Sequence, residues 1–252
     1  MANIKNPNDI VTELVDDYKQ VFGEVLLGVV MYGSAVTHEY RPGVSDVNIL
    51  VVLADNAIEQ VRKCRHIAQK WHKRNVAIPF FITPEFIASA VDSYPVEFLD
   101  IQTSHRILYG EDYFSRCEID RENLRRQCER ELRGVLIRLQ KEFVGSGEKD
   151  HALCMITIAS MKKMLPVFKA LLRLNNKPVP KTQSDVVMAI EDLYDLGASA
   201  LSGMLNLGRK GTRPDQYAAL FDSFSKTVGS LVHRVVARAM KLDRKLFLSK
   251  EN

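Results

Sequence analysis

One short stretch of the chain carries residues that could do chemistry together. In MYGSAVTHEYRPGVSDVNILVVL, residues 31–53, Gly33 and Ser34 end one apolar run. Asp46 and Asn48 open the next apolar run. Backbone N–H groups and a hydroxyl that converge where a strand turns into a helix can hold a triphosphate. Side chains two apart on a strand share a face, so Asp46 and Asn48 are placed to bind Mg²⁺ beside those phosphates.

This pattern resembles the nucleotidyltransferase superfamily of DNA polymerase β, and most closely its bacterial aminoglycoside and minimal nucleotidyltransferases. In those proteins an apolar strand ends in Gly-Ser, and Ser-Asp-x-Asp opens the next hydrophobic strand; residues 25–53 match this order. The resemblance implies a nucleoside triphosphate as donor and Mg²⁺ as cofactor. It assigns Gly33, Ser34 and Ser45 to the nucleotide site and makes Asp46 the first metal ligand.

The chain departs from the family at the other two acidic positions. Asn48 stands where the second carboxylate belongs, and it keeps a carbonyl oxygen but adds no negative charge, which weakens Mg²⁺ binding. The family's third carboxylate lies on the strand after a long helix, whereas that stretch here, VAIPFFIT at 76–83, contains no acid. Acids follow at Glu85, Glu97 and Asp100. Glu97 and Asp100 lie three apart on a strand-like run, so their side chains point to opposite faces. At most one of the two can therefore reach the site and act as the general base.

Two functions of different classes follow from these residues. The first is transfer of a nucleoside monophosphate to a hydroxyl of a small molecule or a protein, slowly or not at all in the present chain. The alternative is a degenerate nucleotidyltransferase-fold protein that binds a nucleotide or a partner protein without chemistry. For Asn48, a structural hydrogen bond to the neighbouring turn and a residual contact to metal or phosphate are equally open. We expect Gly33, Ser34, Asp46 and Asn48 to line the main ligand pocket, in a cleft between two domains.

The elements that position these residues are alternating helices and strands. Helix signals surround 6–23, where Asn6 precedes Pro7, and apolar runs predict buried strands at 25–31 and 46–53. We further predict one long helix over 56–74, a strand at 76–83 that Pro79 confines to an edge or a bulge, a helix at 84–92, and strand-like segments at 94–102 and 106–112.

Long amphipathic segments fill the rest of the chain. The helical spacing of the apolar residues, and the Gly-, Pro- or polar-rich stretches between them, predict helices at 121–143, 151–174, about 183–207 and 214–241. The fold class is therefore α+β, with a nucleotidyltransferase-like mixed sheet and helices at 1–115 followed by an all-α helical bundle at 120–245. The segment 151–174 is apolar around most of its circumference, which predicts a role in the pocket wall or in a homodimer interface.

The composition limits the expected cellular location and the expected classes of partner. The chain has 252 residues, of which 46% are hydrophobic and 26% charged, and its net charge of +4 is modest for that length. It contains no apolar run of about 18 residues and no secretory-type start, and its four cysteines form no C-x-x-C pair. We therefore expect a cytoplasmic protein with reduced thiols and with neither a membrane nor a nucleic acid as partner.

Overall fold

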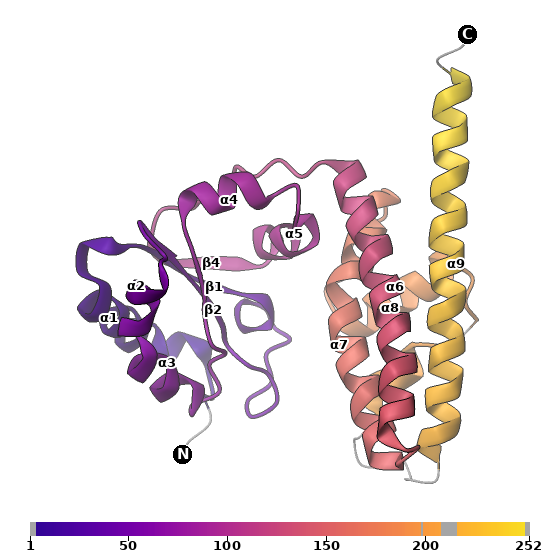
Figure 1. The fold of residues 1–252 in the computed structure, drawn as a ribbon, viewed down its shortest axis with the longest axis horizontal. Coiled ribbons are helices and arrows are strands. Elements are labelled where there is room, and N and C mark those ends of the chain that lie inside the picture. The colour runs from indigo at the N-terminus through magenta and orange to yellow at the C-terminus, as the bar shows by residue number, and fades with distance from the viewer. Residues whose placement is uncertain (1–3, 198, 208–215, 250–252) are drawn as a thin grey trace. The chain divides into compact units, whose positions relative to one another are not determined.

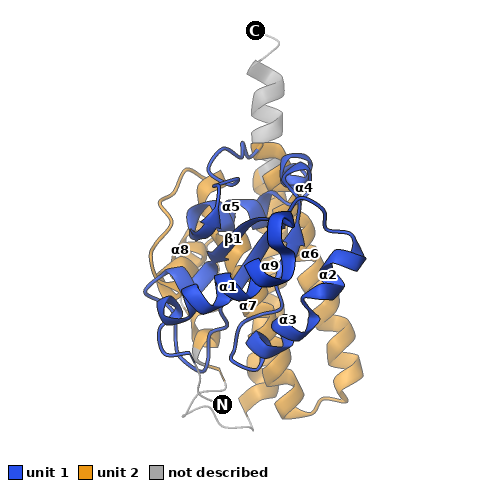
Figure 2. Cartoon of the chain, turned by 90° about the vertical axis from the view of Figure 1, so that its left-hand side faces the viewer, with its two compact units in different colours: residues 1–119 blue, residues 120–252 orange. Residues whose placement is uncertain are grey.

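The computed structural model describes residues 4–197, 199–207 and 216–249. The chain divides into two compact units, residues 1–119 and residues 120–252, which Figure 2 distinguishes by colour. Within the described ranges, no helix is both long and apolar enough to cross a membrane. Each unit is built around its own elements.

The first unit contains a mixed four-stranded sheet in the order β3-β2-β1-β4, of which Figure 1 labels β2, β1 and β4. β1 runs antiparallel to both β2 and β4, while β2 and β3 are parallel. The predicted edge position of the Pro79 segment is confirmed, because β3 is an outer strand and follows this proline directly. The strands are β1 (Leu26–Tyr32), β2 (Asn48–Leu53), β3 (Phe80–Ile82) and β4 (His105–Gly110).

Two cores cover the two faces of this sheet. Side chains of β1 and β2 that alternate along each strand pack either against the first helices or against α4 and α5. Met31 and Ile49 belong to the first core, and Val30 and Leu50 to the second. The elements are the 3-10 helix η1 (Pro7–Ile10), α1 (Val11–Phe22), the 3-10 helix η2 (Gly23–Val25), α2 (Ile58–Lys63), α3 (Arg65–His72), α4 (Pro84–Ala90) and α5 (Pro95–Thr103).

The predicted helix start at Asn6 is confirmed, since its side chain accepts a hydrogen bond from the backbone N–H of Asn8 at 3.0 Å. Two other predictions are wrong. The single helix over 56–74 is divided into α2 and α3, because the backbone leaves helical geometry at Cys64. The strand-like segment at 94–102 is helix α5, which Pro95 begins and which buries Phe98 in the second core.

The second unit is all helical, as predicted. Its helix α7 contacts α6, α8, α9 and η4 of the same unit, and the predicted role of 151–174 in a pocket wall or a homodimer interface stays a prediction. The predicted helix at 183–207 is wrong in length, because left-handed residues at Asp195 and Gly197 break it after Leu193. The elements are α6 (Arg121–Ser146), α7 (Asp150–Leu174), α8 (Gln183–Leu193), the 3-10 helix η4 (Ser202–Asn206) and α9 (Tyr217–Ser249).

The cysteines are free thiols, and most of them are core residues. Cys64 is buried in the first unit, and Cys128 and Cys154 are buried in the second. Cys117 is only half-buried, in the segment that ends the first unit. Small apolar packing is the usual role of such thiols.

Candidate active site

The turn after β1 is held by hydrogen bonds on both sides of Gly33. The N–H of Gly33 donates to the carbonyl of Ser104 at 2.9 Å, which ties the turn to the start of β4. The N–H and hydroxyl of Thr37 both donate to the carbonyl of Ser34 at 3.1 Å. These bonds close the 3-10 helix η3 (Gly33–Val36), so the strand leads into one short helical turn.

Asn48 lies directly against this turn. Gly33 has a φ of +73°, and a β-carbon on it would stand 3.0 Å from the amide nitrogen of Asn48. Among the described residues the Asn48 side chain forms no hydrogen bond, so the structural hydrogen bond left open by the sequence is not formed within those residues. Tyr32 and Asn48 are cross-strand neighbours, which explains how β1 and β2 bring the turn and the amide together.

Asp46 lies two residues before Asn48, ahead of β2. Val47 between them is fully buried in the core of α1 and α3, so alternation along the strand turns Asn48 to the side where α4 and α5 pack. The charge of Asp46 acts on Tyr40, which packs against the core of α1 and α3. Asp46 is exposed, and Ser45 before it has a hydroxyl that accepts a hydrogen bond from the N–H of Arg41 at 3.1 Å.

The two downstream acids lie on α5 and not on a strand. Residues three apart on a helix lie on neighbouring positions of one side, so the expectation that Glu97 and Asp100 point to opposite faces is wrong. Burial, and next to it the charge of Asp100, raise the pKa of Tyr32 to about 12. Asp100 is half-buried and Glu97 is exposed. Asp100 is thus an acid near Tyr32, which is the last residue of β1 and directly precedes Gly33.

The strand that carries an acid in the resembling family carries an exposed aromatic residue here. Phe80 pairs with Leu50, whose side chain belongs to the core of α4 and α5. Paired residues share a face, so Phe80 lies on the same face as Asn48, and it is 64% exposed. Glu85, the next acid, is exposed in the first turn of α4. β3 itself (Phe80–Ile82) contains no acidic residue.

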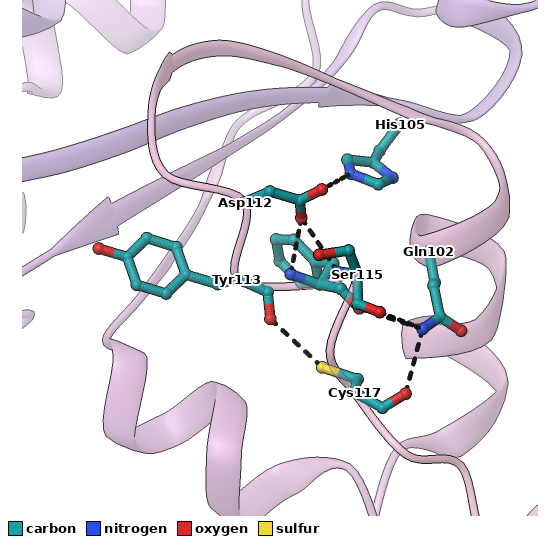
Figure 3. Close-up of polar contacts among 7 residues, drawn as sticks. Gln102, His105, Asp112, Tyr113, Ser115 and Cys117 are labelled. Carbon is teal, nitrogen blue, oxygen red and sulfur yellow. Dashed lines mark hydrogen bonds and ion pairs between the residues drawn. The ribbon is translucent and has the colours of Figure 1, made fainter.

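A histidine that the sequence did not indicate lies in line with Asn48 and Tyr32 across three neighbouring strands. His105 is the cross-strand neighbour of Tyr32 in β4, and its Nε2 atom lies 3.2 Å from a carboxylate oxygen of Asp112 (Figure 3). The other oxygen of Asp112 accepts the N–H groups of Phe114 and Ser115 at 2.9 and 3.0 Å. The spacing of His105 and Asp112 in the sequence matches no motif, because the turn after β4 brings the two side chains together.

The environment of Asp112 favours its charged form. Burial raises the pKa of Asp112, but the hydrogen bonds from Ser115, Phe114 and His105 outweigh burial and hold the pKa below its usual value. Gln102 adds further anchors, since its side-chain nitrogen donates to the carbonyls of Phe114 and Cys117 at 3.1 Å (Figure 3). This network fixes the segment after β4 in place.

The donor set at Asp46 and Asn48 is small for a metal ion. Among the residues that the structure describes, no three His, Cys, Asp or Glu side chains lie close enough together to bind one. Mg²⁺ is usually held by one or two carboxylates together with substrate phosphates. One carboxylate and one amide oxygen therefore fit Mg²⁺ that enters with a triphosphate, and they do not fit Mg²⁺ held by the protein alone.

Two cavities of the first unit lie beside this region and not on it. One, of about 470 Å³, opens next to η1 and η3, and the other, of about 460 Å³, lies between α4 and the segment 113–118. Neither is lined by Gly33, Ser34, Asp46 or Asn48. The predicted pocket between the two units stays a prediction.

The sheet and the helical second unit have a counterpart among solved structures. The structure of spectinomycin adenyltransferase AAD(9) from Enterococcus faecialis with ATP and spectinomycin matches this chain with a TM-score of 0.55 and 12% sequence identity, over 89% of this chain and 98% of that chain. The chain has a nucleotidyltransferase fold. The fold class that the resemblance implied is thereby confirmed, including the helical region after the sheet. No family model and no curated protein matches the sequence.

Within this nucleotidyltransferase fold, the Gly-Ser turn follows one central strand and Asp46 precedes the next, and their role in a nucleotide site stays a prediction. β1 leads into Gly33, and β2 begins two residues after Asp46. The second acidic position is an amide, and the strand for the third position presents Phe80. The site thus keeps the turn and one carboxylate of the pattern.

Proposed function

We propose that the chain binds a nucleoside triphosphate with Mg²⁺ at the turn of Gly33 and Ser34, and that it transfers the nucleoside monophosphate slowly to a hydroxyl of a small molecule or a protein. The observation that carries the proposal is the position of Asn48 against the Gly33 turn, with the carboxylate of Asp46 two residues before the start of β2. This arrangement supports phosphates on the backbone and a metal-binding oxygen pair beside them. The ATP in the matching adenyltransferase structure is consistent with such a donor.

Transfer of a nucleoside monophosphate requires few protein groups. The acceptor oxygen attacks the α-phosphorus, the bond to the β-phosphate oxygen breaks, and pyrophosphate leaves with its electron pair. Mg²⁺ would be held by Asp46 and Asn48, and it neutralises phosphate charge when bound. Asp100 is the better-placed acceptor for the hydroxyl proton, because its charge reaches Tyr32 next to the turn, whereas Glu97 is exposed one helical turn away.

The second candidate function is nucleotide binding without chemistry. The exposed Phe80 on the site face of β3 favours it, because an aromatic ring there supplies contact area and no charge. Loss of one carboxylate at Asn48 and absence of another on β3 remove most of the charge that organises metal-assisted transfer. Binding would survive this loss better than catalysis.

Calorimetric titration with ATP and with GTP, each with and without Mg²⁺, tests binding. We expect a saturable affinity that Asp46→Asn weakens in Mg²⁺ and that Ser34→Ala weakens in both conditions. Asp16→Asn is the matched control, since Asp16 is an exposed acid on α1 and the substitution makes the same chemical change. Loss of affinity in the control equal to that in Asp46→Asn would point to general charge effects and would contradict the site.

Pyrophosphate release with a panel of hydroxyl acceptors separates the two functions. Release that depends on acceptor and is lost in Asp46→Asn supports transfer. Saturable binding with no release, and with an affinity that Mg²⁺ leaves unchanged, favours the binding function. Absence of nucleotide binding in every condition would contradict both.

A further inference from the structure

A cavity at the N-terminal edge of the sheet has a lining that suits an anion. We call it the N-terminal cavity; it measures about 470 Å³ and lies between η1, η3 and the start of β4. Its volume is in the range of small-molecule sites, roughly 300–1,000 Å³. It is lined by Lys5, Asn6, Pro7, Asn8, Ala35, Val36, Thr37, His38, Tyr40, His105 and Arg106.

The charged side chains in the lining of the N-terminal cavity are cationic. Lys5 and Arg106 line it, and no Asp or Glu does. Within the described part of the chain, neither Lys5 nor Arg106 forms an ion pair with a carboxylate. Two carboxylates lie next to lining residues without being part of the lining: Asp112 is 3.2 Å from His105, and the charge of Asp46 acts on Tyr40. Two cationic groups without a protein counterion therefore face the same space.

Arg106 is held in a fixed orientation at this cavity. One nitrogen of its guanidinium group donates to the side-chain oxygen of Asn8, and the other lies 3.9 Å from the sulfur of Met31. The hydroxyl of Tyr40 donates to the carbonyl of Ile4 at 3.0 Å, which ties the N-terminal segment to the loop after η3. A cation positioned in advance loses less entropy on binding an anion.

The N-terminal cavity is separate from the proposed nucleotide site. Arg106 is paired with Met31, whose side chain belongs to the core of α1 and α3. Asn48 is paired with Tyr32, the next residue along β1, and so lies on the opposite face of the sheet. Neither Ser34 nor Asp46 lines the cavity.

We propose that the N-terminal cavity binds a small molecule that carries a phosphate group. Arg106 would bind two of its oxygens, since a guanidinium group matches this geometry, and Lys5 would add the second charge. The amide and hydroxyl groups of Asn6 and Thr37 lie in the same lining and offer neutral donors. This site differs from the proposed nucleotide site in its binding groups, because Lys5, Asn6, Thr37 and Arg106 take no part in that site. The helix η3 and His105 border both.

Amide chemical shifts of the full chain, titrated with inorganic phosphate at constant ionic strength set by chloride, test the proposal. We expect saturable shifts at Lys5, Asn8 and 36–38. Arg106→Gln and Lys5→Gln should each weaken the affinity by about tenfold, the size of one lost charged hydrogen bond. Arg62→Gln is the matched control, because Arg62 is an exposed arginine on α2 of the same unit and lies outside the cavity lining.

The outcomes separate this site from its alternatives. Lys5 is exposed, so Lys5→Gln keeps the test valid even if Arg106→Gln disturbs the fold. Equal weakening in Arg62→Gln, or linear shifts without saturation, would show general attraction of anions and overturn the proposal. Shifts confined to Ser34 and Asn48 would place phosphate at the nucleotide site and also overturn it. Loss of nucleotide binding alone would leave the N-terminal cavity unaffected.

Discussion

At position 33 a side chain would meet two obstacles in the turn after β1. The φ of +73° is a left-handed conformation that costs an L-residue about 1–2 kcal/mol, and the added β-carbon would stand 3.0 Å from the Asn48 amide nitrogen. We predict that Gly33→Ala lowers the free energy of unfolding by about 1–3 kcal/mol and displaces Asn48. Chemical denaturation measures the first effect, and the Asn48 side-chain amide resonances report the second.

Gly134→Ala is the control for that substitution. Gly134 lies in helix α6, and a β-carbon on it would meet nothing within 4 Å. Alanine should stabilise this helix by about 0.5–1 kcal/mol. If Gly33→Ala and Gly134→Ala change stability in the same direction, the strain assigned to the turn does not exist.

The amide at position 48 can be converted to the acid of the family pattern. In Asn48→Asp the new carboxylate lies two residues from Asp46, and without metal the two charges repel. A ligand that binds only the folded state stabilises it by mass action. We therefore predict that Mg²⁺ with ATP raises the melting temperature of Asn48→Asp by more than that of the wild type. Identical responses over a wide concentration range would mean that positions 46 and 48 do not form a metal site.

Among the elements, α6 carries a charge network that titrates in acid. Hydrogen bonds from Arg125 and then Arg126 hold the pKa of Glu122 at about 2, below its ordinary 4.5. A lowered folded-state pKa gives stability that is present above pH 4.5 and is lost as the pH falls towards 2. Glu122 is 42% exposed, so solvent screening limits the contribution to about 1 kcal/mol or less.

We predict that Glu122→Gln lowers the free energy of unfolding at neutral pH by up to about 1 kcal/mol, and that the difference from the wild type disappears as the pH falls from 4.5 to about 2. Urea unfolding at several pH values measures it. The control is Glu142→Gln, an exposed acid later on the same helix. A difference for Glu122→Gln that persists at pH 2 would contradict the ion-pair origin.

Helices and strands whose apolar residues repeat with one clear period could be predicted from the sequence, whereas segments whose pattern fits both a helix and a strand could not. The continuous apolar run of β1 could be read directly, because every residue of this central strand except Gly28 packs against one of two cores. In α5, Val96 and Phe98 alternate like a strand, and only the burial of Phe98 and Ile101 against the sheet decides for a helix. Such a choice is made by tertiary packing, which local pattern does not contain.

The same distinction applies to the candidate site. Gly33, Ser34 and Asp46 could be predicted, since their positions follow from strand ends in one contiguous stretch. The contact of Asn48 with Gly33 depends on the register of β1 against β2, and the pair of His105 and Asp112 depends on the turn after β4. These relations join strands, and spacing along the chain does not specify them.

For the whole molecule, each unit has a core of its own. The buried clusters on both faces of the sheet draw only on residues of the first unit. Domains with separate cores usually fold alone. We predict that a chain of residues 1–119 folds and unfolds in one cooperative transition, as measured by circular dichroism. A separate chain of 120–252 is the comparison, and failure of 1–119 to melt cooperatively would show that its core needs the helical unit.

The distribution of free thiols makes the chain its own reporter of local opening. Cys64 reports on the sheet unit, and Cys128 and Cys154 report on α6 and α7 of the helical unit, because a buried thiol reacts only when its surroundings open. Cys117, which is half-buried, should be modified first. The labelling order of the other three under native conditions therefore ranks the opening free energies of the two units, and a ligand that bound only one unit would slow only the thiols within it.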